Sequence, residues 1–170
     1  EKSLKNFKIP EDAQIIDATD KTVLPGLIDA HCHTMGSGDP NVKHRRDHVF
    51  DSIGTLTAKS YRHAILDLAA GFTTLREATN RDYVAVALRD AIDGGKLTGP
   101  RIVASGNALA ITGGHLDQPK GLPHRSQIER DVSNICDGPT EARKATRYQL
   151  KMGVDWIKIS ASLSEHVKGY

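Results

Sequence analysis

The feature that most constrains this sequence is an alternation of short apolar runs with longer segments of helical spacing. The runs have the length of a strand and are rich in Val, Ile, Thr or Phe. They occupy 27–30, 72–75, 101–105 and 156–159. The segments that place apolar residues on one helical face occupy 53–70, 83–92 and 139–152. This β-α-β-α-β-α-β order predicts an α/β fold with parallel strands and right-handed crossover helices.

Two connections in this pattern are too long to be simple linkers. The segments 34–52 and 107–139 each follow an expected strand and carry several His and Gly residues. Long loops after the carboxyl ends of strands are where α/β proteins build their sites. We therefore expect a functional site at that end of the sheet. Four strands are too few to close a barrel, which needs about eight strands.

Composition excludes several classes of partner. The 170 residues contain 23 Lys plus Arg and 21 Asp plus Glu, a net charge of +2 that argues against nucleic-acid and membrane-surface binding. No apolar run approaches the roughly 18 residues that a transmembrane helix needs. The two cysteines form no disulfide framework, and no signal peptide is visible in these residues, which start with Glu1 rather than Met. The compartment is therefore left unknown, with a cytoplasmic location slightly favoured.

The strongest local signal is a His-x-His pair at the end of the first expected strand. Because side chains alternate along a strand, Asp29, His31 and His33 should share one face while Cys32 points to the other. Two imidazoles at this spacing can bind one divalent ion, such as zinc or iron. The alternative is a pair of exposed loop histidines; the position at a strand end favours the ligand pair.

Lys158 is the second candidate. On a two-residue period, Trp156, Lys158 and Ser160 face a barrel interior, whereas Ile157 and Ile159 face covering helices. Loss of hydration favours the neutral amine. A neutral amine can add carbon dioxide to become a carbamate, whose oxygens can bridge two metal ions. The alternative is that Lys158 extends its ammonium group to solvent, and spacing alone favours that alternative.

His115 is a candidate substrate-binding residue. It ends a Gly-Gly-His sequence in the second long loop, where the glycines allow close approach of the backbone. Its imidazole could hydrogen-bond a substrate carboxylate or carbonyl. A purely structural role in the loop is the alternative.

Four motifs, in chain order, resemble those of the amidohydrolase superfamily. They are VLPGLIDAHCH (23–33), GFTTLRE (71–77), SGN with ITGGH (105–107 and 111–115) and WIKI (156–159). The similarity is to the branch of Xaa-Pro dipeptidase (prolidase)-like and imidazolonepropionase-like enzymes, which includes metallo-carboxypeptidases and ochratoxin-hydrolysing amidases. It implies a distorted (β/α)8 barrel, of which this chain holds strands one to four. Residues 1–24 would end a small flanking β-sandwich, and 25–170 would form the first half of the barrel.

The resemblance also implies a metal site. His31 and His33 would bind one divalent ion, and a carboxylated Lys158 would bridge two, with zinc the expected metal. Further His ligands from strands five and six, and a general-base Asp from strand eight, lie outside these residues, so no catalytic residue is assigned here. The complementary C-terminal half of the barrel is therefore an expected partner. Open sheet edges and an exposed apolar interior also favour association, and we expect a homo-oligomer.

The expected activity is hydrolysis of an amide or peptide-type bond by a metal-bridged hydroxide. The resemblance favours a dipeptide or N-acyl amino acid as substrate. A cyclic amide such as an imidazolone is the alternative. A different alternative is that the chain is a non-catalytic half-barrel that needs a complementary chain. A third alternative is a lactonase or deaminase with one metal ion; Lys158 disfavours it, because the deaminases generally lack the bridging carbamate.

Overall fold

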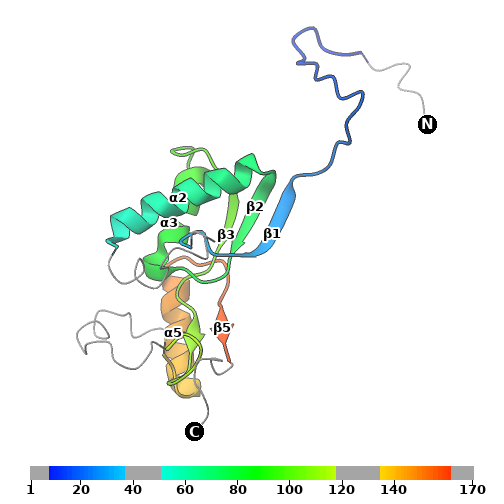
Figure 1. The fold of residues 1–170 in the computed structure, drawn as a ribbon. Helices are drawn as coiled ribbons and strands as arrows, with labels where there is room; N and C mark the ends of the chain where they lie inside the picture. The colour runs from blue at the N-terminus through cyan, green and yellow to red at the C-terminus, as the bar shows by residue number, and fades with distance from the viewer. Residues whose placement is uncertain (1–7, 37–50, 118–134, 162–170) are drawn as a thin grey trace.

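The centre of the fold is a parallel three-stranded sheet. The computed structural model describes residues 8–36, 51–117 and 135–161. The strands of the sheet are β1 (Leu27–Cys32), β2 (Phe72–Glu77) and β3 (Arg101–Ala104), paired in the order β1-β2-β3. Each crosses to the next through a helix, as the alternating sequence pattern predicts (Figure 1).

Helices α2 (Ile53–Ala69) and α3 (Val84–Asp93) cover one side of the sheet (Figure 1). The Ser52 hydroxyl accepts a hydrogen bond from the Thr55 backbone N–H at 3.2 Å and so caps the start of α2. The helix ends before Gly71, whose φ of +100° lies in the left-handed region that favours glycine. Both ends match the expected helix 53–70 to within a residue. A short 3-10 turn, η1 (Arg81–Tyr83), precedes α3.

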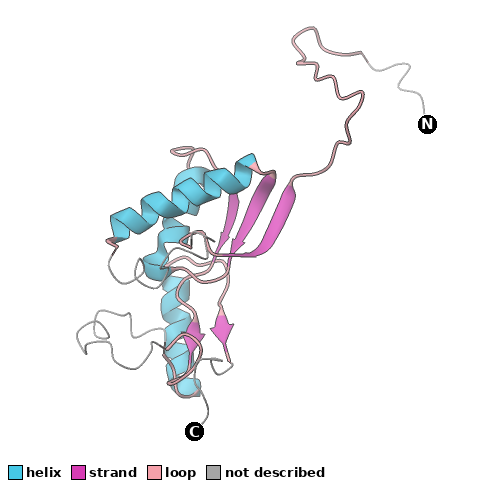
Figure 2. Ribbon diagram, in the orientation of Figure 1, coloured by secondary structure: helices cyan, strands magenta, loops and turns pink. Residues whose placement is uncertain are grey.

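The fourth expected strand takes a different form from the other three. Trp156 makes an isolated parallel bridge to Ser105, so this segment continues the sheet beyond β3. The following strand, β5 (Ile159–Ser160), pairs instead with a short strand that the sequence pattern did not indicate, β4 (Leu109–Ala110). Figure 2 shows this two-stranded pair beside helix α5 (Pro139–Lys151), apart from the main sheet.

Gly106 explains where the chain turns from β3 towards β4. A Cβ atom at this position would lie 2.0 Å from Gln149 Oε1 and 2.7 Å from Tyr83 Cε1. Only glycine lets the backbone approach α5 and η1 this closely. The hydrophobic core that results is built from α3 and its neighbours. Its buried members are Tyr83, Val84, Ala85, Val86, Leu88, Ile102, Ala104 and Val154.

The N-terminal segment 8–26 extends away from the sheet (Figure 1). Within the described part of the chain it belongs to no strand, and nearly all of its residues are exposed. Residues 1–7 lie outside the described residues, so the expected sandwich boundary at residue 24 stays a prediction. Among the helices that the structure describes, none is long and apolar enough to cross a membrane.

Candidate functional site

His31 and His33 lie together at the carboxyl end of β1. Their ring centroids are 5.2 Å apart, the ring planes are inclined by 73°, and both residues are exposed. A metal ion bound by imidazole nitrogen sits about 2.0–2.1 Å from each ligand atom. This spacing therefore suits two rings that converge on one divalent ion.

The strand that carries the histidines has one extra residue between Asp29 and Cys32, which balances a shift of the opposite sense between Leu27 and Ile28. Asp29 pairs with Leu75 and Cys32 with Glu77, so three residue steps on β1 match two on β2. Asp29 and Cys32 thus face the same side of the sheet, and both are half-buried, whereas His31 is exposed. The expectation that Cys32 faces the side opposite to Asp29 is wrong.

The cause of this bulge is local. The Asp29 carboxylate accepts a hydrogen bond from the His31 backbone N–H at 2.9 Å. Such a side-chain to backbone bond competes with regular strand pairing. A bulge re-aims the residues that follow it, and bulges are common next to active sites. Because of this bulge, the side of the sheet that Asp29 faces does not determine the side that His31 faces.

A buried carboxylate lies behind the histidine pair. Glu77, at the end of β2, is 0% exposed, and its Oε2 accepts hydrogen bonds from Thr34 N at 2.8 Å and Thr34 Oγ1 at 2.6 Å. Its Oε1 lies 3.8 Å from His33 Nδ1. Burial raises the pKa of Glu77 to about 7, although the bonds from Thr34 oppose the rise. Sequence reasoning assigned Glu77 no role; its one signal was an acid at the end of an expected strand.

Lys158 follows Trp156 and Ile157 and is half-buried. Ile157 packs against the core, whereas Trp156 contacts Arg76 on the side of the sheet that the helices leave uncovered. The Arg76 guanidinium lies 3.6 Å from the centroid of the Trp156 ring, and its Nη1 donates to the Ala30 carbonyl at 3.3 Å. Arg76 thereby connects β1, which carries the histidines, with the segment that carries Lys158.

Lys158 lies on the segment that continues the sheet beyond β3, so β2 and β3 separate this segment from β1. Its role as a metal ligand stays a prediction. Within the described ranges, no group of three or more His, Cys, Asp or Glu residues could hold a metal ion. The donor set nevertheless fits a divalent metal, because two imidazoles lie 5.2 Å apart and the buried Glu77 Oε1, which has no hydrogen-bond partner among the described residues, lies behind one of them.

His115 is exposed on the turn that follows β4. Asp117 Oδ2 accepts from Gly113 N at 2.8 Å, and Asp137 Oδ1 accepts from Thr112 N at 2.8 Å. These bonds hold the turn, while the remainder of the long loop, 118–134, lies outside the described residues. Substrate binding by His115 stays a prediction.

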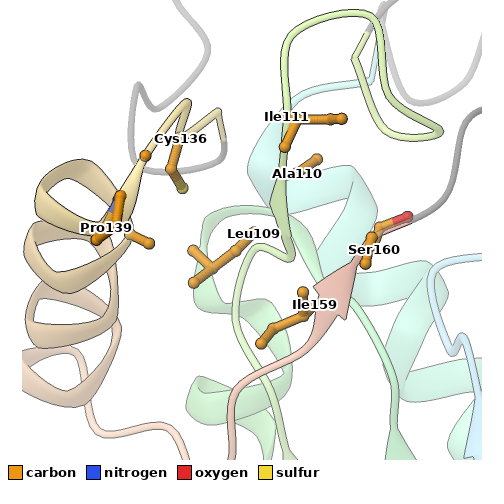
Figure 3. A pocket seen from close by; sticks show the side chains of 10 residues that line it. Leu109, Ala110, Ile111, Cys136, Pro139, Ile159 and Ser160 are labelled. Carbon is orange, nitrogen blue, oxygen red and sulfur yellow. The ribbon is translucent and has the colours of Figure 1, made fainter.

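A cavity of about 290 Å³ opens elsewhere, between β4, β5 and α5 (Figure 3). Leu109, Ile159 and Pro139 line it, together with the Cys136 thiol, whose pKa is raised by burial. The described residues of its lining include no carboxylate and no imidazole.

Comparison with known proteins shows which family this chain belongs to. The sequence model of the amidohydrolase family matches residues 22–166. Ochratoxinase of Aspergillus niger is 28% identical over 152 residues, which are 82% of this chain and 31% of ochratoxinase. The chain thus spans about a third of the length of the curated relatives it matches.

Solved structures of hydrolases with a similar fold support the same family. A prolidase complexed with N-methylphosphonate-L-proline superposes with a TM-score of 0.74 at 31% identity, over 95% of this chain and 40% of the prolidase. A Xaa-Pro dipeptidase with methionine bound in the active site gives a TM-score of 0.66 at 34% identity, over 79% of this chain and 33% of the dipeptidase. The parallel sheet, its covering helices and the matched segment all lead to one conclusion: the chain, whose described strands do not close a barrel, belongs to the amidohydrolase family.

Proposed function

We propose that this chain supplies the N-terminal metal-binding part of a hydrolase that cleaves amide or peptide-type bonds. The observation that carries the proposal is the convergence of His31 and His33 at the carboxyl end of β1, with 5.2 Å between ring centroids. That end of the strands is where barrel enzymes place their sites. Membership of the amidohydrolase family supports the hydrolytic class of the reaction.

The roles of the residues follow from their chemistry. His31 and His33 would bind one ion through imidazole nitrogen, and a carboxylated Lys158 would bridge it to a second. Bound divalent metal, with zinc the expected ion, would lower the pKa of a water molecule and polarise the scissile carbonyl. Arg76 would keep the two ligand-bearing segments in their relative places through Ala30 and Trp156.

The proposed substrate is a dipeptide or an N-acyl amino acid. The prolidase similar to this chain is complexed with a phosphonate of proline, and ochratoxinase is a second relative. His115, in the loop beyond β4, would donate a hydrogen bond to a carboxylate or carbonyl of such a substrate. The complementary C-terminal half of the barrel would supply the remaining ligands and the general base, and the assembled protein would be a homo-oligomer.

The test is metal analysis combined with hydrolysis of Xaa-Pro dipeptides and N-acyl amino acids by the protein that carries this chain. We expect the wild type to bind divalent metal and to be active. The double variant H31A/H33A should lose both properties, and K158A should lose part of the metal and most of the activity. The matched control is H115A, which should keep the metal and raise KM.

Two results would overturn parts of this proposal. A wild type that binds no divalent metal after loading would refute the metal site. Full metal occupancy and full activity in K158A would refute the bridging role of Lys158 and leave the histidine pair standing.

A further inference from the structure

Glu77 is a buried acid that the proposed metal site does not use as a ligand. Its side chain is fully buried, and only Oε2 has hydrogen-bond partners of good geometry among the described residues, although the nearby Asn80 amide also helps to lower the pKa of the carboxyl group. The second oxygen, Oε1, is directed towards His33, with Nδ1 at 3.8 Å. A buried carboxylate oxygen without a partner is uncommon in folded proteins and calls for an explanation.

The position of the Glu77 carboxylate is tightly determined. Thr34, which directly follows His33, donates to Oε2 from both its backbone N–H and its hydroxyl, at 2.8 and 2.6 Å. At the same level Cys32 pairs with Glu77, and the Ala78 N–H donates to the Cys32 carbonyl at 2.9 Å. Thr34, on one side of His33, therefore holds the carboxylate, and Cys32, on the other side, holds the backbone at Glu77.

His33 Nδ1 consequently faces two acceptors. One is Glu77 Oε1 at 3.8 Å and the other is the Thr79 carbonyl oxygen at 3.5 Å. The contact with the Thr79 carbonyl is already a long hydrogen bond, and a ring movement of about 1 Å would bring Nδ1 within hydrogen-bond distance of Glu77 Oε1. The tautomer with its hydrogen on Nδ1 satisfies these acceptors, which leaves Nε2 as the nitrogen that can bind a metal.

We propose that Glu77 is a positioning residue, which fixes the ring orientation and the Nδ1–H tautomer of His33 so that Nε2 is presented to a divalent ion beside His31. The inference rests on the proposed function, because it assumes that His33 is a metal ligand. A carboxylate or carbonyl behind a ligating histidine is the usual way in which proteins orient that ligand. The competing explanation is that Glu77 only anchors Thr34 and hence the start of the loop after β1.

The experiment compares E77Q with a matched control, D155N. Both substitutions turn a carboxylate into an amide, but Asp155 accepts from the Ala104 N–H at 2.7 Å and pairs with Arg89 at 2.8 Å. Zn²⁺ affinity is measured by competition with a chromophoric chelator. The tautomer of His33 is measured from the ¹⁵N chemical shifts of its ring in the metal-free protein. Thermal unfolding without metal reports any general loss of stability.

We expect E77Q to bind Zn²⁺ about 10- to 100-fold more weakly than the wild type, and D155N to bind it as the wild type does. The ¹⁵N shifts of His33 should indicate the Nδ1–H tautomer in the wild type and a mixture in E77Q. If E77Q does not fold, T34V removes one of the two bonds that hold the carboxylate, and a smaller loss of affinity in the same direction is expected.

Equal Zn²⁺ affinity and equal His33 shifts in E77Q and the wild type would overturn the inference and leave Glu77 as a structural anchor. A wild type that binds no Zn²⁺ would refute the proposed function, whereas the tautomer measurement would still show whether Glu77 orients His33. The two failures are therefore distinguishable.

Discussion

Replacement of Arg76 by methionine removes a link across the uncovered side of the sheet. The guanidinium carbon lies 3.6 Å from the centroid of the Trp156 ring, and Nη1 donates to the Ala30 carbonyl at 3.3 Å. Methionine keeps most of the aliphatic stem and abolishes both contacts. The strand that carries the histidines and the segment that carries Lys158 then lose a shared partner, so we expect R76M to lower the free energy of unfolding.

The magnitude follows from the exposure of Arg76. A cation over an aromatic ring contributes about 0.5–1 kcal/mol at an exposed site. A hydrogen bond as long as 3.3 Å contributes roughly another 0.5–1 kcal/mol. The expected loss for R76M is therefore about 1–2 kcal/mol. R76K keeps the charge without the planar stacking group, so its loss should be intermediate.

The assay is a double-mutant cycle with R76M, W156F and the double variant, followed by urea unfolding and circular dichroism. We expect a coupling energy of about 0.5–1 kcal/mol between the two side chains. Trp156 is the single tryptophan of the sequence, so its fluorescence in the wild type and R76M reports the loss of the stacked cation directly. A coupling energy within about 0.2 kcal/mol of zero, with unchanged emission, would refute the proposed link.

Further predictions concern positions away from the metal site. G106A should destabilise the protein by about 1–3 kcal/mol, because its methyl group would meet Gln149 Oε1 at 2.0 Å. G54A is the matched control; it lies in helix α2 with space around it and should stabilise by roughly 0.5–1 kcal/mol in the same urea assay. Hydrogen bonds from Thr112 lower the pKa of Asp137 in the folded state, so the stability they provide is present above the unfolded pKa of about 4 and is lost as pH falls further. Unfolding measured between pH 7 and pH 3 should therefore show a smaller acid-induced loss in D137N than in the wild type; an equal loss in both would contradict this cause.

The elements that could be predicted from the sequence are those set by local signals. Helix α2 starts at its Ser52 cap and stops before Gly71, as the spacing and the glycine indicate. The α5 helix begins at Pro139, close to its expected bounds. Caps, proline and glycine act within a turn of the helix, so a single sequence is enough to place them.

The elements that were missed depend on partners distant in the chain. The β4 strand has only two residues and exists because β5 pairs with it. The extra residue in β1 is visible only in its register with β2, where Asp29 and Cys32 meet Leu75 and Glu77. A strict two-residue alternation along β1 could not reveal it, because alternation assumes regular pairing.

The sequence by itself determined the order of strands and helices, since periodicity is a local property of the chain. Motif spacing, which is also local, indicated the candidate metal ligands His31, His33 and Lys158. Only the tertiary structure decided which groups surround those candidates. Thr34 and Glu77 are 43 positions apart, yet they form the two bonds that hold a buried carboxylate behind His33. Parallel strands joined through a helix bring such distant residues together at one end of the sheet, and no pattern within either segment records that contact.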